Sequence, residues 1–444
     1  MKKKRHFHTK EICPSKVIRT LGRHILADGF HIVVDLDRSK GSYMVDQVSG
    51  KKYLDMYTYF ATCPIGHNHP RMFDREFLDD LRDASIENPA NSDVYSVEFA
   101  SFVNAFERVA MPKHMKYLFF ITGGALAVEN GLKTAFDWKV RKNFSKGSKH
   151  ELGSQVIHFR EAFHGRSGYT LSITNTNDTK TKYFPKFDWP RIDNPKLRFP
   201  VTWKVIREVE KAESRALGQI NKAIMMNGRD IACLIIEPIQ GEGGDNHFRP
   251  EFLQSLEEIC AKNDIMFMLD EVQTGLGATG KMWAFQHFGI KPDIVAFGKK
   301  TQVCGIMVSK RVDEVRNNVF HESSRINSTW GGNLSDMVRA RRVLEIVHEE
   351  KLVENADRVG KYFLRRLEEI EPKHEEMSNA RGRGLMLAFD LPTAKERDHL
   401  RMKCWKNGFA VLPCWPKSIR FRPPLTISEK EVDHAIELLE KSFK

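Results

Sequence analysis

The 444-residue sequence contains no internal repeat, no low-complexity segment and no long apolar run. A membrane-spanning helix needs about 18 consecutive apolar residues, and no stretch approaches that length. The first residues, Met1–Arg5, are basic, but the apolar segment of a secretory signal does not follow them. We therefore expect a cytoplasmic protein with no membrane partner.

The seven cysteines are odd in number and form no Cys-x-x-Cys motif. Disulfide frameworks use an even number of cysteines, and zinc ribbons use closely spaced pairs. The cysteine pattern therefore argues against both kinds of scaffold, and we expect no metal site. It favours a reducing compartment, in which most of these thiols are small buried hydrophobic groups.

Basic residues outnumber acidic ones, and the formal net charge is +12. Proteins that bind nucleic acid concentrate such charge in one patch or motif. Here the positive residues are spread along the chain, apart from the N-terminal cluster. An anionic cofactor or a dicarboxylate substrate would suit a basic pocket equally well, so we expect no nucleic acid as a partner.

The chain is too long for one ordinary hydrophobic core. We predict an N-terminal segment (1–65), a large α/β domain (66–325) and a C-terminal α+β domain (326–444). In the large domain, apolar runs alternate with amphipathic segments, as in a mostly parallel sheet between helices. The predicted strands cover 117–122, 155–159, 231–237, 265–270, 293–297, 384–391 and 418–422. The predicted helices include 125–142, 250–262 and a closing helix with a capping box at Ser428.

Two of these strands end on residues that could act together. Asp270 ends one apolar strand, and Gly298 and Lys299 directly follow another. Open α/β sheets bind ligands at the carboxyl ends of their strands. Alone, Asp270 could cap a turn and Lys299 could be a solvated loop lysine. Together they are what pyridoxal phosphate requires, because its aldehyde bonds to a lysine and its ring nitrogen needs a carboxylate.

Four further stretches could complete such a site. The segment 122–125, Thr-Gly-Gly-Ala, opens a helix and could bind phosphate through its N–H groups, although it is also a common turn. The segment 163–166, Phe-His-Gly-Arg, offers a ring to stack on a heterocycle and an arginine to bind a carboxylate. Arginines 420 and 422 share one face of a strand but could also pair with surface acids. The hydroxyls of 327–332 could bind phosphate or belong to a simple interdomain loop.

In this order and at these separations, the motifs resemble the ω-aminotransferases, the class III family of fold-type I pyridoxal-phosphate enzymes. The resemblance runs from Ile32 to the last helix. It implies that Lys299 bonds to the cofactor and that Asp270 binds the pyridine nitrogen. The family's lysine directly follows a glycine, as Lys299 does, whereas Lys300 stands one residue later. It also implies a homodimer with shared active sites.

The resemblance assigns further residues to the cofactor and the substrates. The cofactor-binding set is completed by Gly124, Ala125, Phe163, Val272, Gln273, Ser328 and Thr329. Of these, Thr329 would complete the phosphate site from the second subunit. The substrate-binding set is Arg166, Glu242, Gln273 and Arg420. Glu242 would pair with Arg420 while the amine donor is bound and swing away for 2-oxoglutarate.

Local variants within these motifs favour one amine donor. The segments 123–126, 241–247 and 298–305 resemble those of L-lysine 6-aminotransferases. The implied reaction converts L-lysine and 2-oxoglutarate into 2-aminoadipate 6-semialdehyde, which cyclises to a piperideine carboxylate, and L-glutamate. Ornithine is the natural alternative, because one methylene is worth only about 1–3 kcal/mol of discrimination. The pocket that separates such donors is predicted to include Tyr59, Phe60, Thr62 and Cys63.

Other functions on the same fold stay open at this point. A 4-aminobutyrate aminotransferase would differ only in its donor. An aminomutase or racemase would keep Lys299 and Asp270 but would not need the pair of Glu242 and Arg420. A non-catalytic binding relative would have lost the lysine or the aspartate, and this chain has both.

Overall fold

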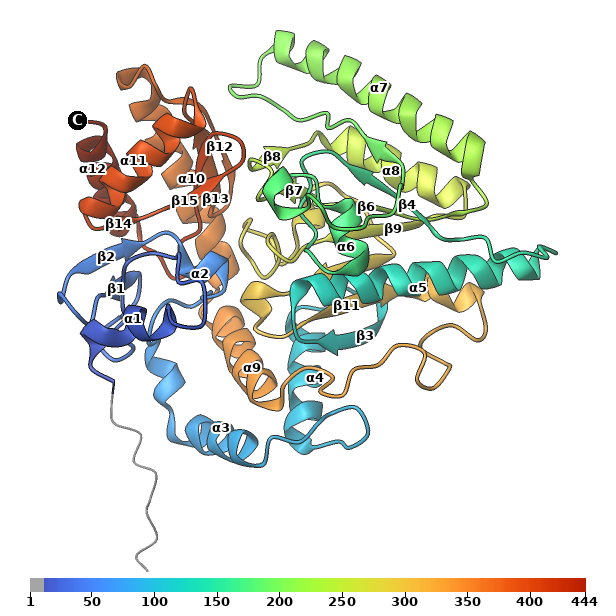
Figure 1. Ribbon diagram of the computed structural model, residues 1–444, viewed down its shortest axis with the longest axis horizontal. Helices are drawn as coiled ribbons and strands as arrows, with labels where there is room; N and C mark the ends of the chain where they lie inside the picture. The colour runs from blue at the N-terminus through green and yellow to red at the C-terminus, as the bar shows by residue number, and fades with distance from the viewer. Residues whose placement is uncertain (1–11) are drawn as a thin grey trace, which may run out of the picture.

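The computed structural model describes residues 12–444, so the basic cluster at Met1–Arg5 lies outside the described residues. A seven-stranded sheet forms its centre, in the order β3-β11-β10-β9-β6-β4-β5 (Figure 1). The strands are β3 (Met115–Ile121), β4 (Gln155–Phe159), β5 (Arg191–Ile192), β6 (Ile231–Ile236), β9 (Met266–Asp270), β10 (Ile294–Phe297) and β11 (Cys304–Ser309). Neighbours from β10 to β5 pair in parallel, whereas β11 is antiparallel to both β10 and β3. The predicted α/β class with a mostly parallel sheet is therefore confirmed.

Helices cover both faces of this sheet, which explains why its strands are apolar throughout. On one face, α5 (Gly124–Ser145) packs against Met268 and Ile294. Their neighbours Leu269 and Val295 point to the other face, where they join the core that includes α8 (Pro250–Lys262). Successive side chains of a strand point to opposite faces, so both sets must be apolar. The long helix α7 (Trp203–Asn227) adds to the core on the α8 side.

The C-terminal elements form a smaller antiparallel sheet in the order β12-β13-β16-β15. Its strands are β12 (Ser378–Arg383), β13 (Met386–Asp390), β15 (Leu412–Cys414) and β16 (Ser418–Phe421). The helices here are α9 (Leu334–Glu349), α10 (Leu352–Ile370), α11 (Ala394–Lys406) and α12 (Glu429–Phe443). At the start of α12, Ser428 and Glu431 form the predicted capping box. The predicted strands and closing helix of this region are thus confirmed.

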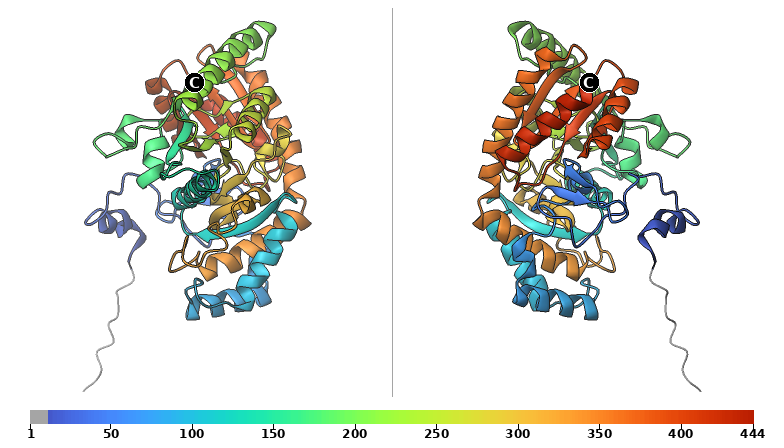
Figure 2. Two further views of the ribbon diagram at one scale, coloured as in Figure 1. Left: turned by 90° about the vertical axis from the view of Figure 1, so that its right-hand side faces the viewer. Right: turned by 90° about the vertical axis from the view of Figure 1, so that its left-hand side faces the viewer.

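Residues 32–55 pack on the C-terminal elements (Figures 1 and 2). Strands β1 (Tyr43–Val45) and β2 (Lys52–Asp55) form a sheet with β14 (Phe409–Ala410), which lies parallel to β2. Helices α3 (Arg75–Glu87) and α4 (Val97–Val109) pack against α9. This arrangement brings residues near 58–62 to the carboxyl-terminal edge of the central sheet. Between residues 12 and 444, no helix is both long and apolar enough to cross a membrane.

Candidate active site

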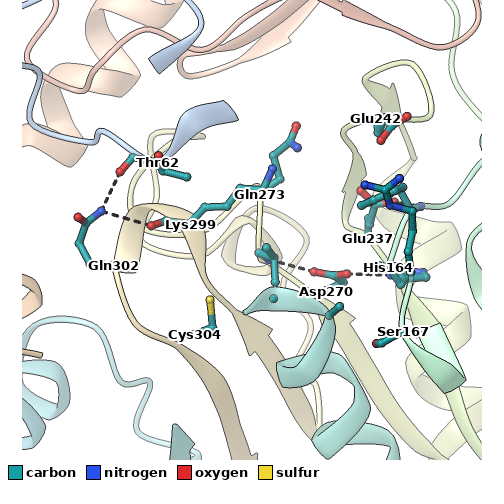
Figure 3. Close-up of a pocket in the computed structure, with 16 residues that line it drawn as sticks. Thr62, His164, Ser167, Glu237, Glu242, Asp270, Gln273, Lys299, Gln302 and Cys304 are labelled. Carbon is teal, nitrogen blue, oxygen red and sulfur yellow. Dashed lines mark hydrogen bonds and ion pairs between the residues drawn. The ribbon is translucent and has the colours of Figure 1, made fainter. Parts of the chain in front are cut away.

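A cavity of 650 Å³ opens at the carboxyl ends of β9 and β10 (Figure 3). Asp270 is the last residue of β9, and Lys299 follows β10 after one glycine. Both side chains line the cavity because β9 and β10 are parallel neighbours that end at the same edge of the sheet. Its lining residues are Thr62, Gly124, Ala125, Phe163, His164, Gly165, Arg166, Ser167, Glu237, Glu242, Asp270, Val272, Gln273, Lys299, Gln302 and Cys304.

Only one of the two adjacent lysines reaches this cavity. Lys299 begins the short turn η5 (Lys299–Thr301) with a φ of 53°, and its Nζ donates to the Phe60 carbonyl at 3.3 Å. The Lys300 Nζ points elsewhere and donates to the Gln273 carbonyl at 2.9 Å. Burial, together with the positive charges of Arg420 and Arg422, lowers the pKa of Lys299 to about 8. A neutral, nucleophilic amine is therefore accessible near neutral pH.

The Asp270 carboxylate is buried and oriented from two sides. Its Oδ1 accepts the Val272 N–H at 3.0 Å, and its Oδ2 lies 2.8 Å from His164 Nδ1. Both contacts are drawn in Figure 3. Hydrogen bonds of this kind hold a carboxylate in one orientation, as a site that must bind a cationic ring nitrogen requires.

Glu237 is a second buried carboxyl group beside the cavity. Its Oε1 accepts the Phe163 N–H and its Oε2 accepts the Gly241 N–H, both at 2.9 Å. Burial raises the pKa of Glu237 to about 7, while His164 lowers it and Asp270 raises it further. The side chain thus joins the loop that carries Phe163 to the loop that follows Gly241.

The start of α5 forms a narrow cradle on the cavity wall. The first N–H groups of a helix have no partner within the helix, so those of Gly124 and Ala125 are available to an anion. Gly165, with a φ of +124°, lies against the first turn of α5, so that a Cβ added to it would be 2.5 Å from the Ala125 Cβ. A Cβ on Gly124 would lie 3.0 Å from Val272 Cγ1. Small residues are therefore required here by close packing.

Two buried arginines, Arg420 in β16 and Arg422 just after it, contact the Gln273 side chain. Arg420 Nη1 and Arg422 Nη2 each donate to Gln273 Oε1 at 3.0 Å. Arg422 is also paired with Asp245 at 2.5 Å. Among residues 12–444, no acidic oxygen lies within ion-pairing distance of Arg420, and its buried Nε has no hydrogen-bond partner. Arg420 therefore keeps the capacity to bind an added carboxylate.

Glu242 and Arg420 form no ion pair in this structure, in which Glu242 has another partner. The pair is predicted only for the enzyme with the amine donor bound, so it stays a prediction. Glu242 pairs with Lys180, whose Nζ lies 5.1 Å from the centre of the Phe163 ring. Glu242 nevertheless lines the cavity. Here Lys180 provides the Glu242 carboxylate with another cation, and only Nη1 of Arg420 donates to Gln273.

The remaining predicted residues divide into two groups. Phe163, Val272, Gln273 and Arg166 line the cavity with the reactive pair. Ser328 and Thr329 do not line it, and Thr329 is exposed on the loop before α9. That location is compatible with the expectation that Thr329 acts in the site of a second subunit.

The predicted donor pocket is built on an unusual turn. The residues of α2 (Thr58–Ala61) all have φ between 44° and 66°, a left-handed conformation that L-residues rarely adopt in succession. Asp55 Oδ1 accepts the N–H groups of Tyr57 and Thr58, each at 2.8 Å, and holds the chain there. The turn directs the Phe60 carbonyl toward Lys299 and places Thr62 on the cavity.

Tyr59 and Cys63 line a neighbouring cavity of 360 Å³ instead of the main one. The two cavities share Thr62 and Gln302, which are linked by a hydrogen bond of 2.7 Å. Of the four residues predicted for the donor pocket, only Thr62 therefore lines the main cavity.

Several functional-site residues were not assigned from the sequence. Glu237 had a visible signal, because an acid ends the apolar strand β6 just before a proline. His164 lies within the predicted segment 163–166, but its contact with Asp270 is not visible from spacing. Lys180 and Gln302 have no local signal, since their partners are 62 and 240 residues away.

These residues fit pyridoxal phosphate, the cofactor that the sequence predicts. The amine of Lys299, the oriented carboxylate of Asp270 and the cradle at Gly124 and Ala125 surround one cavity. They match an aldehyde, a pyridine nitrogen and a phosphate respectively. No group of His, Cys, Asp or Glu side chains within 12–444 is arranged to hold a metal ion.

Comparisons with known proteins agree with this geometry. A family model described as "Aminotransferase class-III" matches residues 26–443. An L-lysine-epsilon aminotransferase from Mycobacterium tuberculosis is 53% identical over 425 residues, which cover 95% of this chain and 94% of that protein. One from Streptomyces clavuligerus is 49% identical over 430 residues, covering 96% and 93%.

A solved structure, a lysine aminotransferase from Mycobacterium tuberculosis, matches with a TM-score of 0.95 and 52% sequence identity. The match covers 97% of this chain and 99% of that one. Fold, family model and sequence identity extend over nearly the whole length. The chain therefore belongs to the class-III aminotransferases.

Proposed function

We propose that this protein is a pyridoxal-phosphate-dependent L-lysine 6-aminotransferase with 2-oxoglutarate as amino acceptor. The observation that carries the proposal is the placement of Lys299, Asp270 and the cradle at Gly124 around one cavity. The lysine donor is supported by the relatives named above, which match this chain over nearly its full length. The products are 2-aminoadipate 6-semialdehyde, which cyclises, and L-glutamate.

Each group around the cavity then has one task toward the cofactor. Bound there, pyridoxal phosphate supplies an aldehyde that carries the amino group and a ring that takes up electrons. The N–H groups of Gly124 and Ala125 bind the phosphate. Phe163 and Val272, which line the cavity, would pack on the two faces of the cofactor ring. In our proposal the amide N–H of Gln273 would donate to the phenolic oxygen of the cofactor.

Two side chains control the protons. Asp270 holds the proton on the pyridine nitrogen, because a carboxylate stabilises the cationic ring. With pyridoxal phosphate bound, the Lys299 amine would move a proton between the substrate carbon and the cofactor carbon. Its lowered pKa allows this amine to accept a proton near neutral pH and to return it.

The two substrates place their carboxylates at different points. In our proposal Arg166 binds the α-carboxylate of L-lysine, and so sets the distance from that carboxylate to the reacting 6-amino group. Arg420 binds a carboxylate of 2-oxoglutarate. A buried arginine without a partner is costly, so Glu242 pairs with Arg420 while lysine is bound and leaves it for 2-oxoglutarate.

Replacing Glu242 with Ala should impair the two half-reactions unequally. Without this carboxylate, Arg420 stays unpaired when L-lysine binds, so we expect the lysine half-reaction to slow about tenfold more than the 2-oxoglutarate half-reaction. Stopped-flow absorbance of the cofactor with each substrate alone measures both. Equal slowing of both half-reactions would argue against the role of Glu242.

We also propose that two subunits share their active sites. In support, Thr329 lies outside the cavity of its own chain on an exposed loop, and exposed apolar side chains such as Phe60 lie close to the site. Sedimentation analysis should show a dimer. The Thr329→Ala variant should release the cofactor at least about tenfold more readily on dilution, the effect of losing one hydrogen bond to a charged group. Unchanged cofactor affinity would count against this contact.

The donor can be tested directly by competition. Initial rates with L-lysine, L-ornithine and 4-aminobutyrate, each with 2-oxoglutarate, should give the highest kcat/KM for L-lysine. Cyclised product and glutamate should form in equal amounts. A higher kcat/KM for ornithine would keep the reaction class and overturn the proposed donor.

A further inference from the structure

The ion pair between Lys180 and Glu242 has no part in the function proposed so far. Lys180 ends the short turn η3 (Asp178–Lys180), which follows α6 (Gly168–Ile173). Its Nζ binds Glu242 Oε1 and lies 5.1 Å from the centre of the Phe163 ring, so two contacts hold the ammonium group. The side chains of Lys180 and Glu242 are 27% and 21% exposed, so the pair is partly shielded from solvent.

The loop that carries Glu242 packs against Gln273, the side chain that accepts a hydrogen bond from Arg420. This loop joins β7 (Ile239–Gln240) to β8 (Asn246–His247). A Cβ added to Gly241 would lie 2.2 Å from Gln273 Oε1, the atom to which Arg420 donates. The backbone before Glu242 therefore packs on the amide that holds Arg420, while the Glu242 carboxylate faces Lys180.

We infer that Lys180 is the alternative partner that holds Glu242 away from Arg420 and so leaves Arg420 free for the carboxylate of the keto acid. The inference rests on the proposed function, in which Glu242 moves on and off Arg420. A partly buried carboxylate that leaves one cation loses an ion pair unless it finds another. Lys180 stabilises only one of the two positions, and it therefore shifts the equilibrium toward that position.

Lys180 thus acts as a positioning residue with opposite effects on the two substrates. The Lys180→Met variant removes the charge and keeps much of the side-chain volume, so Glu242 should return to Arg420 more often. Binding of glutarate, a dicarboxylate without the keto group, should weaken, and L-lysine should saturate its half-reaction at lower concentration. The factor by which glutarate binding weakens, multiplied by the factor by which the half-saturating concentration of L-lysine falls, should come to about twofold to fivefold. This is the range expected for a partly exposed ion pair.

The measurement is a calorimetric titration of the cofactor-loaded enzyme with glutarate, in wild type, Lys180→Met, Glu242→Gln and the double variant. Since Lys180 acts through Glu242, the Lys180→Met change should weaken glutarate binding only where Glu242 is present. Lys180→Arg should restore wild-type affinity. Lys182→Met is the matched control, because Lys182 is exposed two residues further on and its ammonium group lies over the Tyr183 ring. It should leave glutarate affinity unchanged.

Two results would overturn the inference. Equal weakening of glutarate binding in the Glu242→Gln background would mean that Lys180 contacts the ligand itself. Unchanged affinity in Lys180→Met would mean that the ion pair does not bias Glu242. Failure of the wild-type enzyme to react with L-lysine would instead overturn the proposed donor, which the glutarate titrations do not involve.

Discussion

Replacing Lys299 with Ala is expected to lower turnover with L-lysine and 2-oxoglutarate by about 10²-fold to 10⁴-fold, the usual contribution of a positioned acid–base group. Lys299 is the lysine that lines the cavity with Asp270, and no other amine among its lining residues can take over the proton transfer. Steady-state rates of the purified variant measure the loss. The fold should persist, since the side chain makes one long hydrogen bond, to the Phe60 carbonyl.

Lys300 provides the control for this prediction. Its amine is buried and donates to the Gln273 carbonyl, outside the cavity. Lys300→Met should therefore lower the free energy of unfolding by about 1–3 kcal/mol, because a buried carbonyl loses its donor. Turnover per folded molecule should persist. Normal turnover in Lys299→Ala together with loss of turnover in Lys300→Met would show that Lys300, and not Lys299, is the catalytic lysine.

Replacing Asp270 with Asn should lower turnover by about 10²-fold to 10³-fold, the cost of removing one charge-stabilising group. Asparagine keeps the size of the side chain and can still accept the Val272 N–H. It cannot hold a proton on the ring nitrogen, so the electrons released from the substrate carbon are less well stabilised. Cofactor content and steady-state rates of this variant are the measurements.

The His164→Gln variant tests the orientation of the Asp270 carboxylate without removing its charge. Glutamine removes the ring that contacts Asp270 Oδ2 but leaves the carboxylate in place. A smaller loss than in Asp270→Asn is expected. Turnover of Asp270→Asn equal to that of the wild type would contradict the role of the carboxylate.

The sequence predicts the catalytic edge of the sheet well because the signals are local. Apolar runs buried on both faces mark β6, β9 and β10, and their carboxyl ends carry Glu237, Asp270 and, one glycine later, Lys299. The helix α8 spans Pro250–Lys262, the range predicted from the proline at its first position and the following amphipathic pattern. Such features depend on neighbours within about one helical turn or a few strand residues.

Other features depend on contacts that local patterns do not contain. The strand β11 inserts antiparallel between β3 and β10, although the predicted sheet has no such strand. The left-handed turn Thr58–Ala61 contradicts local propensity and is held by Asp55 and by tertiary packing. Lys180 binds Glu242 only because two loops meet beside Phe163.

The most direct test of the central proposal is an absorbance spectrum of the purified, cofactor-loaded enzyme before and after addition of L-lysine alone. The account predicts that the visible band of the cofactor bound to Lys299 bleaches with L-lysine and returns when 2-oxoglutarate is added. Bleaching by ornithine or 4-aminobutyrate but not by L-lysine would contradict the proposed donor. Absence of any cofactor band, even after incubation with pyridoxal phosphate, would contradict the proposed chemistry itself.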